Sequence, residues 1–385
     1  MPPRARLILL QRPLLASAGR RCYSTEAPLI RVTNLPAPST GHIRILEINR
    51  PGARNAISRA LLNSLSNEID DVHSQYDSTT GEELAVKSWN QRFGGTAGQS
   101  EKGPTRAVIL ASAVDQSFCA GADLKERKGF TPEEYVFNVS QICAEPGKAV
   151  FLVVSFGGSE TQGDQANATL PFETGRAAPA VPMTSAFLTH LRSTFTSISA
   201  LPVPTISAIG SIALGGGLEL ALSTHFRVLS SNAVVGLPET RLGIIPGAGG
   251  THRLPALIGI GRARDLVLTG RQVSAPEAYF LGIADRLVEV VPESETEVEK
   301  LKNGDQEAAN KILALARRDV LSEAVRLATE ICEGGPVAVR AALQAVQRPH
   351  EEVENAMYDR VVRTEDRYEA LKAFAERRKP EFKGR

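Results

Sequence analysis

The chain has 385 residues, 42% of them hydrophobic, which is enough to bury a large core in one or more domains. Its formal net charge is +1, from 44 basic and 43 acidic side chains, so we expect no nucleic-acid partner. The four cysteines form no CxxC pair and no metal-binding spacing, which indicates a reducing compartment and no metal site.

The first 25 residues differ in composition from the rest of the chain. Five arginines lie there among apolar and hydroxyl side chains, and no acidic residue precedes Glu26. This composition predicts a mitochondrial transit peptide over 1–25 and a mature protein in the mitochondrial matrix; a disordered arm is the alternative. No later segment has about 18 unbroken apolar residues, so we expect no insertion into a membrane.

Short apolar runs then alternate with amphipathic stretches. Residues 43–48 and 107–110 are typical of strands, and 58–76 places apolar side chains on one face of a helix. Strand, turn and helix patterns repeat as far as about Val291, and residues 305–378 are almost wholly helical. The sequence therefore predicts an α/β fold of repeated ββα-type units followed by a helical part.

These patterns divide the chain into a core over 40–275 and a helical C-terminal part over 276–385. Capping boxes predict helix starts at 131–134 and 274–277. Residues 79–104, rich in Gly, Ser and Thr, predict a surface loop.

A long insertion, 136–184, separates the first capped helix start from a helix pattern near Leu188. Structureless loops of more than about 15 residues are uncommon inside compact domains. Three interpretations stay open for this segment: a disordered surface excursion, a lid, or a translated intron. An ordered insertion here could interrupt the helix that is predicted to begin at 131–134.

Three consecutive glycines, 215–217, join a strand pattern to a helix pattern. Backbone N–H groups at a helix start have no intrahelical acceptor and can stabilise a developing oxyanion. A turn of this kind more often only relieves crowding. It matches neither GxGxxG nor the Gly-Lys-Ser/Thr ending of a phosphate loop, which argues against a dinucleotide site and a nucleotide-phosphate site.

Two glutamates accompany this turn. Glu219 lies two residues after Gly217, and Glu239 lies seven residues before the glycine-rich segment 246–250. Two neighbouring buried carboxylates do not readily ionise together, so one can donate a proton while the other accepts one. Solvated carboxylates are the alternative, because most glutamates lie at the surface.

Four ordered motifs resemble the enoyl-CoA hydratase/isomerase, or crotonase, superfamily: residues 117–126, 201–209, 213–222 and 236–255. The resemblance runs from about His42 to the C-terminus. It implies a crotonase-like spiral of ββα units, with a helical C-terminal part that packs against neighbouring subunits in trimers or pairs of trimers.

The resemblance also implies a set of reacting groups. The N–H groups of Ala122 and Gly216 would form the oxyanion hole for a thioester carbonyl, and Glu219 and Glu239 match the two acids of family hydratases. Because water addition needs both a base and an acid, the pair favours a hydratase over an isomerase. The alternative from another class is a non-catalytic or RNA-binding protein that keeps this fold.

Further positions match family contacts with the CoA substrate, and no separate cofactor is expected. These candidates are Arg54, Ala120, Asp123, Leu124, Lys125, Lys379 and Phe382. A carboxylate at the far end of an acyl group would need a cation, for which Arg127, Lys128 and Arg241 are candidates. A solvated surface position is the alternative for each basic side chain. Cys119 is expected to be a small buried side chain, not a nucleophile.

Overall fold

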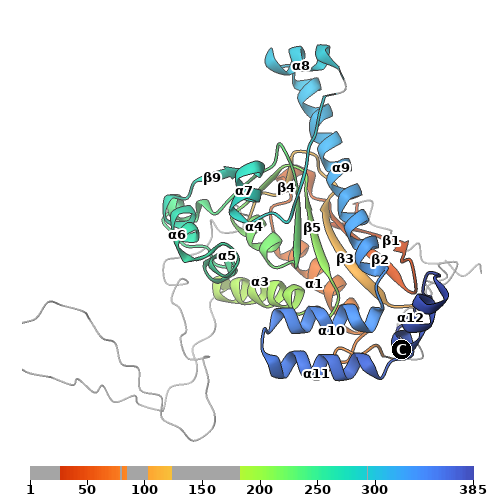
Figure 1. Cartoon of the computed structure of the whole chain (residues 1–385). Coiled ribbons are helices and arrows are strands. Elements are labelled where there is room, and N and C mark those ends of the chain that lie inside the picture. Colours follow the sequence, from red (N-terminus) through yellow and green to blue (C-terminus); the bar gives the residue numbers. More distant parts are fainter. Residues whose placement is uncertain (1–26, 79, 85–102, 124–182, 293) are drawn as a thin grey trace, which may run out of the picture.

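The computed structural model describes residues 27–78, 80–84, 103–123, 183–292 and 294–385, which form two sheets with surrounding helices (Figure 1). Four sequence predictions lie wholly or largely outside these residues. They are the transit peptide, the loop over 79–104, the helix start at 131–134 and the insertion over 136–184.

The large sheet has the strand order β1-β2-β3-β5-β7-β10. Its first two strands pair antiparallel, and every later neighbouring pair is parallel. The strands predicted over 43–48 and 107–110 are confirmed as parts of β2 and β3. The bounds are β1 Ile30–Pro36, β2 His42–Ile48, β3 Thr105–Ser112, β5 Thr205–Ile209, β7 Phe226–Ser230 and β10 Arg286–Val288.

The small sheet has the order β4-β6-β8-β9, with β9 antiparallel to its neighbour. Its bounds are β4 Ser117–Cys119, β6 Ile212–Leu214, β8 Val234–Gly236 and β9 Gln272–Ser274. β4, β6 and β8 each follow a strand of the large sheet along the chain, so successive units give one strand to each sheet. The predicted fold of repeated ββα units is confirmed.

Helices complete these units and cover the sheets. Apolar side chains predicted on one face of α1, Leu62, Leu65, Ile69 and Val72, are all buried, and α1 packs against α3. The bounds are α1 Arg59–His73, α3 Met183–Ser199, α4 Gly216–Leu222, α5 Gly250–Ile258, α6 Ile260–Thr269 and α7 Ala275–Leu281, with short 3-10 helices η1 Pro51–Ala53 and η5 Pro238–Leu242.

Helix α7 begins where the capping box predicts, but the cap hydrogen bond is absent. Ser274 precedes the helix in an extended conformation, and its side chain makes no cap hydrogen bond. Glu277 pairs instead with Arg271, at 2.7 Å between Oε1 and Nη1. The partner of Glu277 is therefore an arginine outside the helix.

Side chains of β3 alternate between two hydrophobic clusters, as the period of a strand requires. Val108 and Leu110 face the main core inside the molecule. Ala107, Ile109 and Ala111 face a second cluster, where α9 (Gln306–Cys332) covers the other side of the large sheet. The large sheet is therefore buried on both faces along its centre.

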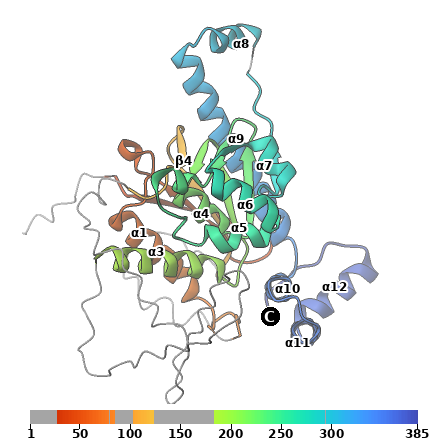
Figure 2. The same ribbon diagram turned by 90° about the vertical axis from the view of Figure 1, so that its left-hand side faces the viewer.

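The C-terminal part is helical, as the sequence pattern predicts. α8 (Glu295–Lys302) lies at the projecting end of α9, and α10 (Pro336–Gln347), α11 (Glu351–Val362) and α12 (Glu365–Glu376) lie to one side of the sheets (Figure 2). β10 belongs to the large sheet, so the sheet extends beyond residue 275. Within the described part of the chain, no helix is long and apolar enough to cross a bilayer.

Candidate active site

Two loops meet where the small sheet ends. β4 and β6 are parallel neighbours, so the segments that follow them, 120–123 and 215–216, leave the same edge of the sheet. A Cβ atom on Gly216 would lie only 3.4 Å from Ala122 N. The sheet therefore brings the two backbone N–H groups expected to form the oxyanion hole close together.

Glycine is required twice in the turn before α4. Gly215 has φ +53°, a backbone conformation that is strained for residues with a side chain. A Cβ atom on Gly217 would lie 2.1 Å from Cys119 O, which is closer than any real contact allows. The glycine run thus lets the start of α4 pack directly on the end of β4.

The N–H groups of Ala122 and Gly216 are available for a ligand. Gly216 is the first residue of α4, where the N–H has no acceptor within the helix. Among the described residues, no backbone carbonyl accepts a hydrogen bond from either N–H group. A carbonyl oxygen in front of this turn would therefore find two donors and the positive end of a short helix.

Backbone hydrogen bonds hold the Ala122 loop in place. Ile57 N donates to Gly121 O at 2.8 Å, and Asp123 N donates to Ile57 O at 3.1 Å. Ala120 N donates to Arg54 O at 3.1 Å. The loop is thus paired with the segment 54–57 like a short extra strand, which fixes the direction of the Ala122 N–H.

Two side chains add to this anchoring. Buried Asn55 Nδ2 donates to Ser112 Oγ at 2.8 Å and to Phe118 O at 3.1 Å. Arg50 forms an ion pair with Asp123, at 2.7 Å between Nη2 and Oδ2. Asp123, which the resemblance places among the CoA contacts, is therefore engaged in holding the loop.

Glu219 is buried, with 2% of its surface exposed, and lies in the first turn of α4. Its Oε1 accepts hydrogen bonds from Ala248 N and Gly250 N, both at 2.8 Å. The glycine-rich segment predicted from the sequence thus supplies donors to this carboxylate. One carboxylate oxygen is fixed by backbone, which sets the orientation of the other.

Glu239 is also buried, at 8% exposure, and belongs to η5. Its Oε1 lies 3.0 Å from the position that a Cβ atom on Gly215 would take. The carboxylate therefore faces the same turn that presents the N–H of Gly216. Both glutamates lie at one corner of the molecule with the N–H groups of Ala122 and Gly216, and we call this place the oxyanion corner. Neither glutamate is a solvated surface carboxylate.

Two arginines hold the segment that binds Glu219. Arg253 Nη1 donates to Ala248 O at 2.8 Å, and Arg192 Nε donates to Gly247 O at 2.6 Å. Burial lowers the pKa of Arg253, and the nearby negative charge of Glu219 opposes this shift. Neither arginine was among the predicted site residues, although Arg253 lies three residues after the glycine-rich segment 246–250, which was a signal for a side chain near it.

Cys119 is a buried free thiol at the end of β4. Burial raises its pKa to about 12, so the reactive thiolate is not formed near neutral pH. The expectation that Cys119 is a small buried side chain is confirmed. No cluster of three His, Cys, Asp or Glu side chains that could hold a metal occurs among the residues with described positions.

The structure brings some of the expected CoA-binding residues to this corner. Ala120 and Arg54 are exposed and adjacent, since Arg54 O accepts from Ala120 N. Leu124 and Lys125 lie outside the described residues, as do Arg127 and Lys128. Arg241 is exposed, and its Nε donates to Thr269 O at 3.0 Å, so α6 holds this side chain.

Lys379 and Phe382 lie at the other end of the large sheet. The Phe382 ring is 3.7 Å from the position that a Cβ atom on Gly335 would take. Gly384, two residues later, approaches the side chain of Arg106 at the start of β3. Because a strand of eight residues spans roughly 26 Å, the structure does not bring these two residues to the chain's own oxyanion corner.

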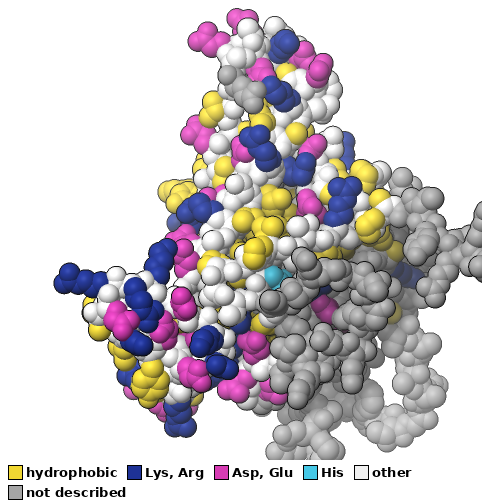
Figure 3. Space-filling view, turned by 90° about the vertical axis from the view of Figure 1, so that its right-hand side faces the viewer, with side chains coloured by type: hydrophobic (Ala, Val, Ile, Leu, Met, Phe, Trp, Pro, Cys, Tyr) yellow, Lys and Arg dark blue, Asp and Glu magenta, His cyan; other side chains and the backbone are white. Residues whose placement is uncertain are grey.

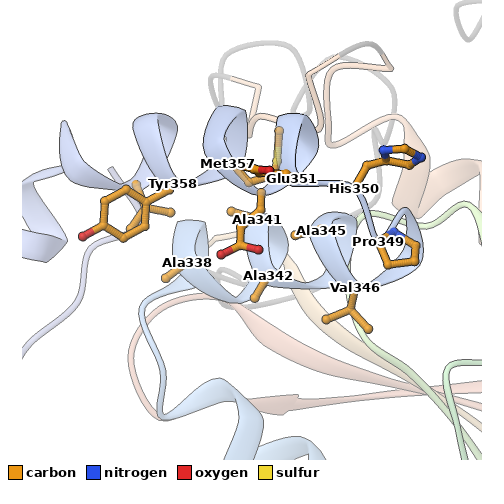
Figure 4. Close-up of a pocket in the computed structure, with 12 residues that line it drawn as sticks. Ala338, Ala341, Ala342, Ala345, Val346, Pro349, His350, Glu351, Met357 and Tyr358 are labelled. Atoms are coloured by element: carbon orange, nitrogen blue, oxygen red, sulfur yellow. The ribbon is translucent and has the colours of Figure 1, made fainter.

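An open apolar groove of about 660 Å³ lies between α10 and α11 (Figure 4). Ala341, Ala345 and Val346 face it from α10, and Met357 and Tyr358 face it from α11. Val346 and Tyr358 are 79% and 68% exposed, which is unusual for large apolar side chains. This groove belongs to the helical part and is not the oxyanion corner.

Known proteins resemble this chain along most of its length. The family model described as Enoyl-CoA hydratase/isomerase matches residues 183–317. Methylglutaconyl-CoA hydratase 1, mitochondrial, of Pyricularia oryzae is 59% identical over 381 residues, covering 98% of this chain and 94% of that protein. The mitochondrial methylglutaconyl-CoA hydratase of Mus musculus is 32% identical, covering 96% and 88%.

A solved structure also resembles the chain. The crystal structure of an enoyl-CoA hydratase from Bacillus anthracis superposes with a TM-score of 0.60 at 30% sequence identity, covering 93% of this chain and all of that one. An enoyl-CoA isomerase/hydratase of Zymoseptoria tritici is 46% identical, covering 97% of this chain and 94% of that protein.

Proposed function

The chain belongs to the enoyl-CoA hydratase/isomerase family, and we propose that it is a hydratase that adds water across the 2,3 double bond of a short 2-enoyl-CoA thioester. The observation that carries this proposal is the meeting of two N–H donors and two buried glutamates at one corner. An isomerase can work with a single base, whereas hydration uses a base and an acid on the same face of the substrate.

The oxyanion hole in this proposal consists of Ala122 N–H and Gly216 N–H. The thioester carbonyl oxygen binds between them and gains negative charge as water adds at C3. Each donor is fixed by the fold before the reaction begins, through the glycine run and the paired loop. Removing one such donor typically costs about 3–4 kcal/mol of barrier.

The two carboxylates divide the proton transfers. Glu219 accepts a proton from the water as its oxygen bonds to C3, and Glu239 delivers a proton to C2. The backbone donors on Glu219 Oε1 favour its charged form and leave Oε2 to face the water. Positioned acid and base groups commonly supply about 10² to 10⁴-fold each.

3-Methylglutaconyl-CoA is the substrate that we propose first, with 3-hydroxy-3-methylglutaryl-CoA as product in leucine degradation. The names of two relatives support this choice, one of them 59% identical. Of the cations considered for the distal carboxylate, Arg241 is tied to α6, so Arg127 and Lys128 are the candidates that we favour. A general short-chain enoyl-CoA hydratase or isomerase of fatty-acid oxidation is the alternative.

The CoA moiety would lie along Arg54 and Ala120, and we propose Asp123, Leu124 and Lys125, which follow Ala120 in the sequence, as further contacts. Lys379 and Phe382 would reach the CoA of a neighbouring subunit, since they lie at the opposite end of their own sheet. We therefore propose a homo-oligomer, a trimer or a pair of trimers. The exposed apolar groove between α10 and α11 supports such packing.

The remaining aspects of the proposal follow from the family and from the relatives. No cofactor beyond the CoA of the substrate is needed. Two relatives are named mitochondrial, and the arginine-rich start of the chain supports import into the matrix. An RNA-binding role has little support, because basic and acidic side chains are interspersed on the face in Figure 3.

The test compares two substrates on the purified protein. Loss of 2-enoyl thioester absorbance is followed with 3-methylglutaconyl-CoA and with crotonyl-CoA. A higher kcat/KM for 3-methylglutaconyl-CoA supports the leucine-pathway assignment, and a higher value for crotonyl-CoA supports the general hydratase. Inactivity on both, combined with tight RNA binding, would overturn the enzymatic proposal.

A further inference from the structure

The C-terminal end of α6 lies against η5, the short helix that carries Glu239. Buried side chains of α6, Ala263 and Leu266, fix this helix to the core. Its C-terminal end is therefore a fixed point beside the oxyanion corner. The two residues that follow Glu239 in η5, Thr240 and Arg241, bind this point with their side chains.

The last carbonyl groups of α6 need donors from outside the helix, because the final C=O groups of any α-helix have no intrahelical N–H partner. Thr240 Oγ1 donates to Val267 O at 3.0 Å, and Arg241 Nε donates to Thr269 O at 3.0 Å. The side chains of η5 thus cap α6. In return, the end of α6 holds two consecutive residues of η5.

The contact between η5 and α6 is close. α6 ends at Gly270, which has φ +58°, and a Cβ atom there would lie 3.1 Å from Thr240 Oγ1 and 3.0 Å from Arg241 Cγ. Thr240 is half-buried and β-branched, whereas Arg241 is exposed and has a long side chain with many rotamers. Of the two, Thr240 is therefore the more rigid link.

On its other side, Glu239 is held by the core. Leu237 directly follows β8 and is 1% exposed, and Pro238 restricts the backbone between Leu237 and Glu239. After η5 the chain turns back, with Ile244 N donating to Glu239 O at 3.2 Å. The backbone of Glu239 thus lies between two anchors, the end of β8 and the end of α6, while its carboxylate faces Gly215.

We propose that Thr240 is a positioning residue for the hydration reaction and acts through its hydrogen bond to the end of α6. It keeps the carboxylate of Glu239 beside Gly215, and it neither transfers a proton nor binds the substrate. Reacting groups must be held within about 0.5 Å of the productive geometry, which a flexible glutamate side chain needs a supporting contact to achieve. The role of Glu239 rests on the proposed function, whereas its placement by Thr240 does not.

Two variants of Thr240 separate the hydroxyl from the shape of the side chain. Thr240→Val removes the hydroxyl and keeps the branched shape, and Thr240→Ser keeps the hydroxyl. Hydration is followed with 3-methylglutaconyl-CoA and with crotonyl-CoA. Thr240→Val should lower kcat about tenfold and change KM by less than about twofold, because a misplacement of about 1 Å can cost about 10²-fold in rate. Thr240→Ser should restore the kcat of the unaltered protein.

Thr329→Val is the matched control. The hydroxyl of Thr329 also donates to a helix carbonyl, Val325 O, at 2.8 Å, but it does so within α9 on the other side of the large sheet. This variant should leave kcat unchanged. An equal loss in Thr329→Val, no recovery in Thr240→Ser, or an undiminished kcat in Thr240→Val would overturn the proposal.

Crystal structures of the unaltered protein and of Thr240→Val test the placement without an assay. The carboxylate of Glu239 should lie more than about 0.5 Å farther from Gly215 in the variant. An unmoved carboxylate would overturn the proposal. A protein that hydrates neither thioester would refute the proposed function, and the two crystal structures would still decide whether Thr240 sets the position of Glu239.

Discussion

The two ends of the parallel sheets hold buried charge in different ways. At the carboxyl end, Glu219 is held by two backbone N–H groups and Glu239 lies beside a glycine turn. At the amino end, Arg106 pairs with Glu83, and the buried guanidinium of Arg340 stacks on Tyr76. The first arrangement places two buried carboxylates next to the turn that presents backbone N–H groups, and the second joins helices to the core.

We infer from this difference that the buried charges at the carboxyl end serve the proposed reaction. At the carboxyl end, backbone N–H groups fix the carboxylate of Glu219, and such groups do not move when a proton is transferred. The amino end uses long side chains from four segments of the chain, which link α10 and α11 to β3. We therefore expect substitutions at the carboxyl end to change the rate, and substitutions at the amino end to change stability.

The largest effect is expected from removing one acid. Glu239→Gln and Glu219→Gln should each lower kcat by about 10² to 10⁴-fold while leaving the melting temperature within a few degrees, because glutamine keeps the size and one carbonyl acceptor. Steady-state hydration kinetics and thermal unfolding measure the two quantities. Glu299→Gln, at an exposed position of α8, is the control. Undiminished turnover in Glu239→Gln would remove this residue from the mechanism.

The next effect is expected at the glycine turn. Gly217→Ala places a Cβ atom 2.1 Å from Cys119 O, so the start of α4 must move away from Ala122. Activity should fall at least 100-fold, and the free energy of unfolding should fall by about 1–3 kcal/mol.

Gly261→Ala is the matched control, because a Cβ atom there meets nothing within 4 Å. This change in helix α6 should leave activity intact and should stabilise the protein by up to about 1 kcal/mol. Equal activity in the two alanine variants would mean that close packing of the turn does not set the oxyanion hole.

A smaller effect is expected from loosening the segment that holds Glu219. Arg253→Met removes the hydrogen bond to Ala248 O, and kcat should fall about tenfold with little change in KM, since hydrogen bonds from charged groups contribute about 1.5–3 kcal/mol. Arg262→Met, which also removes a bond to a backbone carbonyl but in α6, is the control. A change in KM alone would assign Arg253 to substrate binding instead of positioning.

No effect on the rate is expected from the last change, which concerns acid stability at the amino end. Burial lowers the pKa of His225 to about 4, and its Nδ1 accepts a hydrogen bond from Thr205 N at 3.0 Å. Because the unfolded state binds its proton first, stability is present above pH 6.5 and is lost between pH 6.5 and 4. The loss should be at most about 3 kcal/mol.

His225→Gln should flatten this part of the stability profile, measured by urea unfolding at several pH values. The side chain also contacts Gln347 of α10, at 2.5 Å between its Nε2 and the amide nitrogen, so the loss occurs where the helical part meets the core. An unchanged slope in the variant would place the acid-sensitive group elsewhere.

The sequence predicts more of the carboxyl end of the sheets, with its glycine turn and two glutamates, than of the amino end. The strands β2 and β3, the buried face of α1 and the glycine turn all follow from local sequence patterns. Arg106 and Arg340 are 234 positions apart in the chain, so only the packing of α10 brings them together. The role of Arg253 does not follow from residue types, because its partner is a backbone carbonyl; only its position three residues after Gly250 points to it.

Hydration in ¹⁸O-labelled water tests the central claim most directly. The purified protein is given 3-methylglutaconyl-CoA, and the product is analysed by mass spectrometry. We predict one ¹⁸O atom per product molecule, located at the C3 hydroxyl, and no such product from a variant in which both Glu219 and Glu239 are glutamine. A product isomeric with the substrate and free of label, or full labelling by the double variant, would contradict the proposed mechanism.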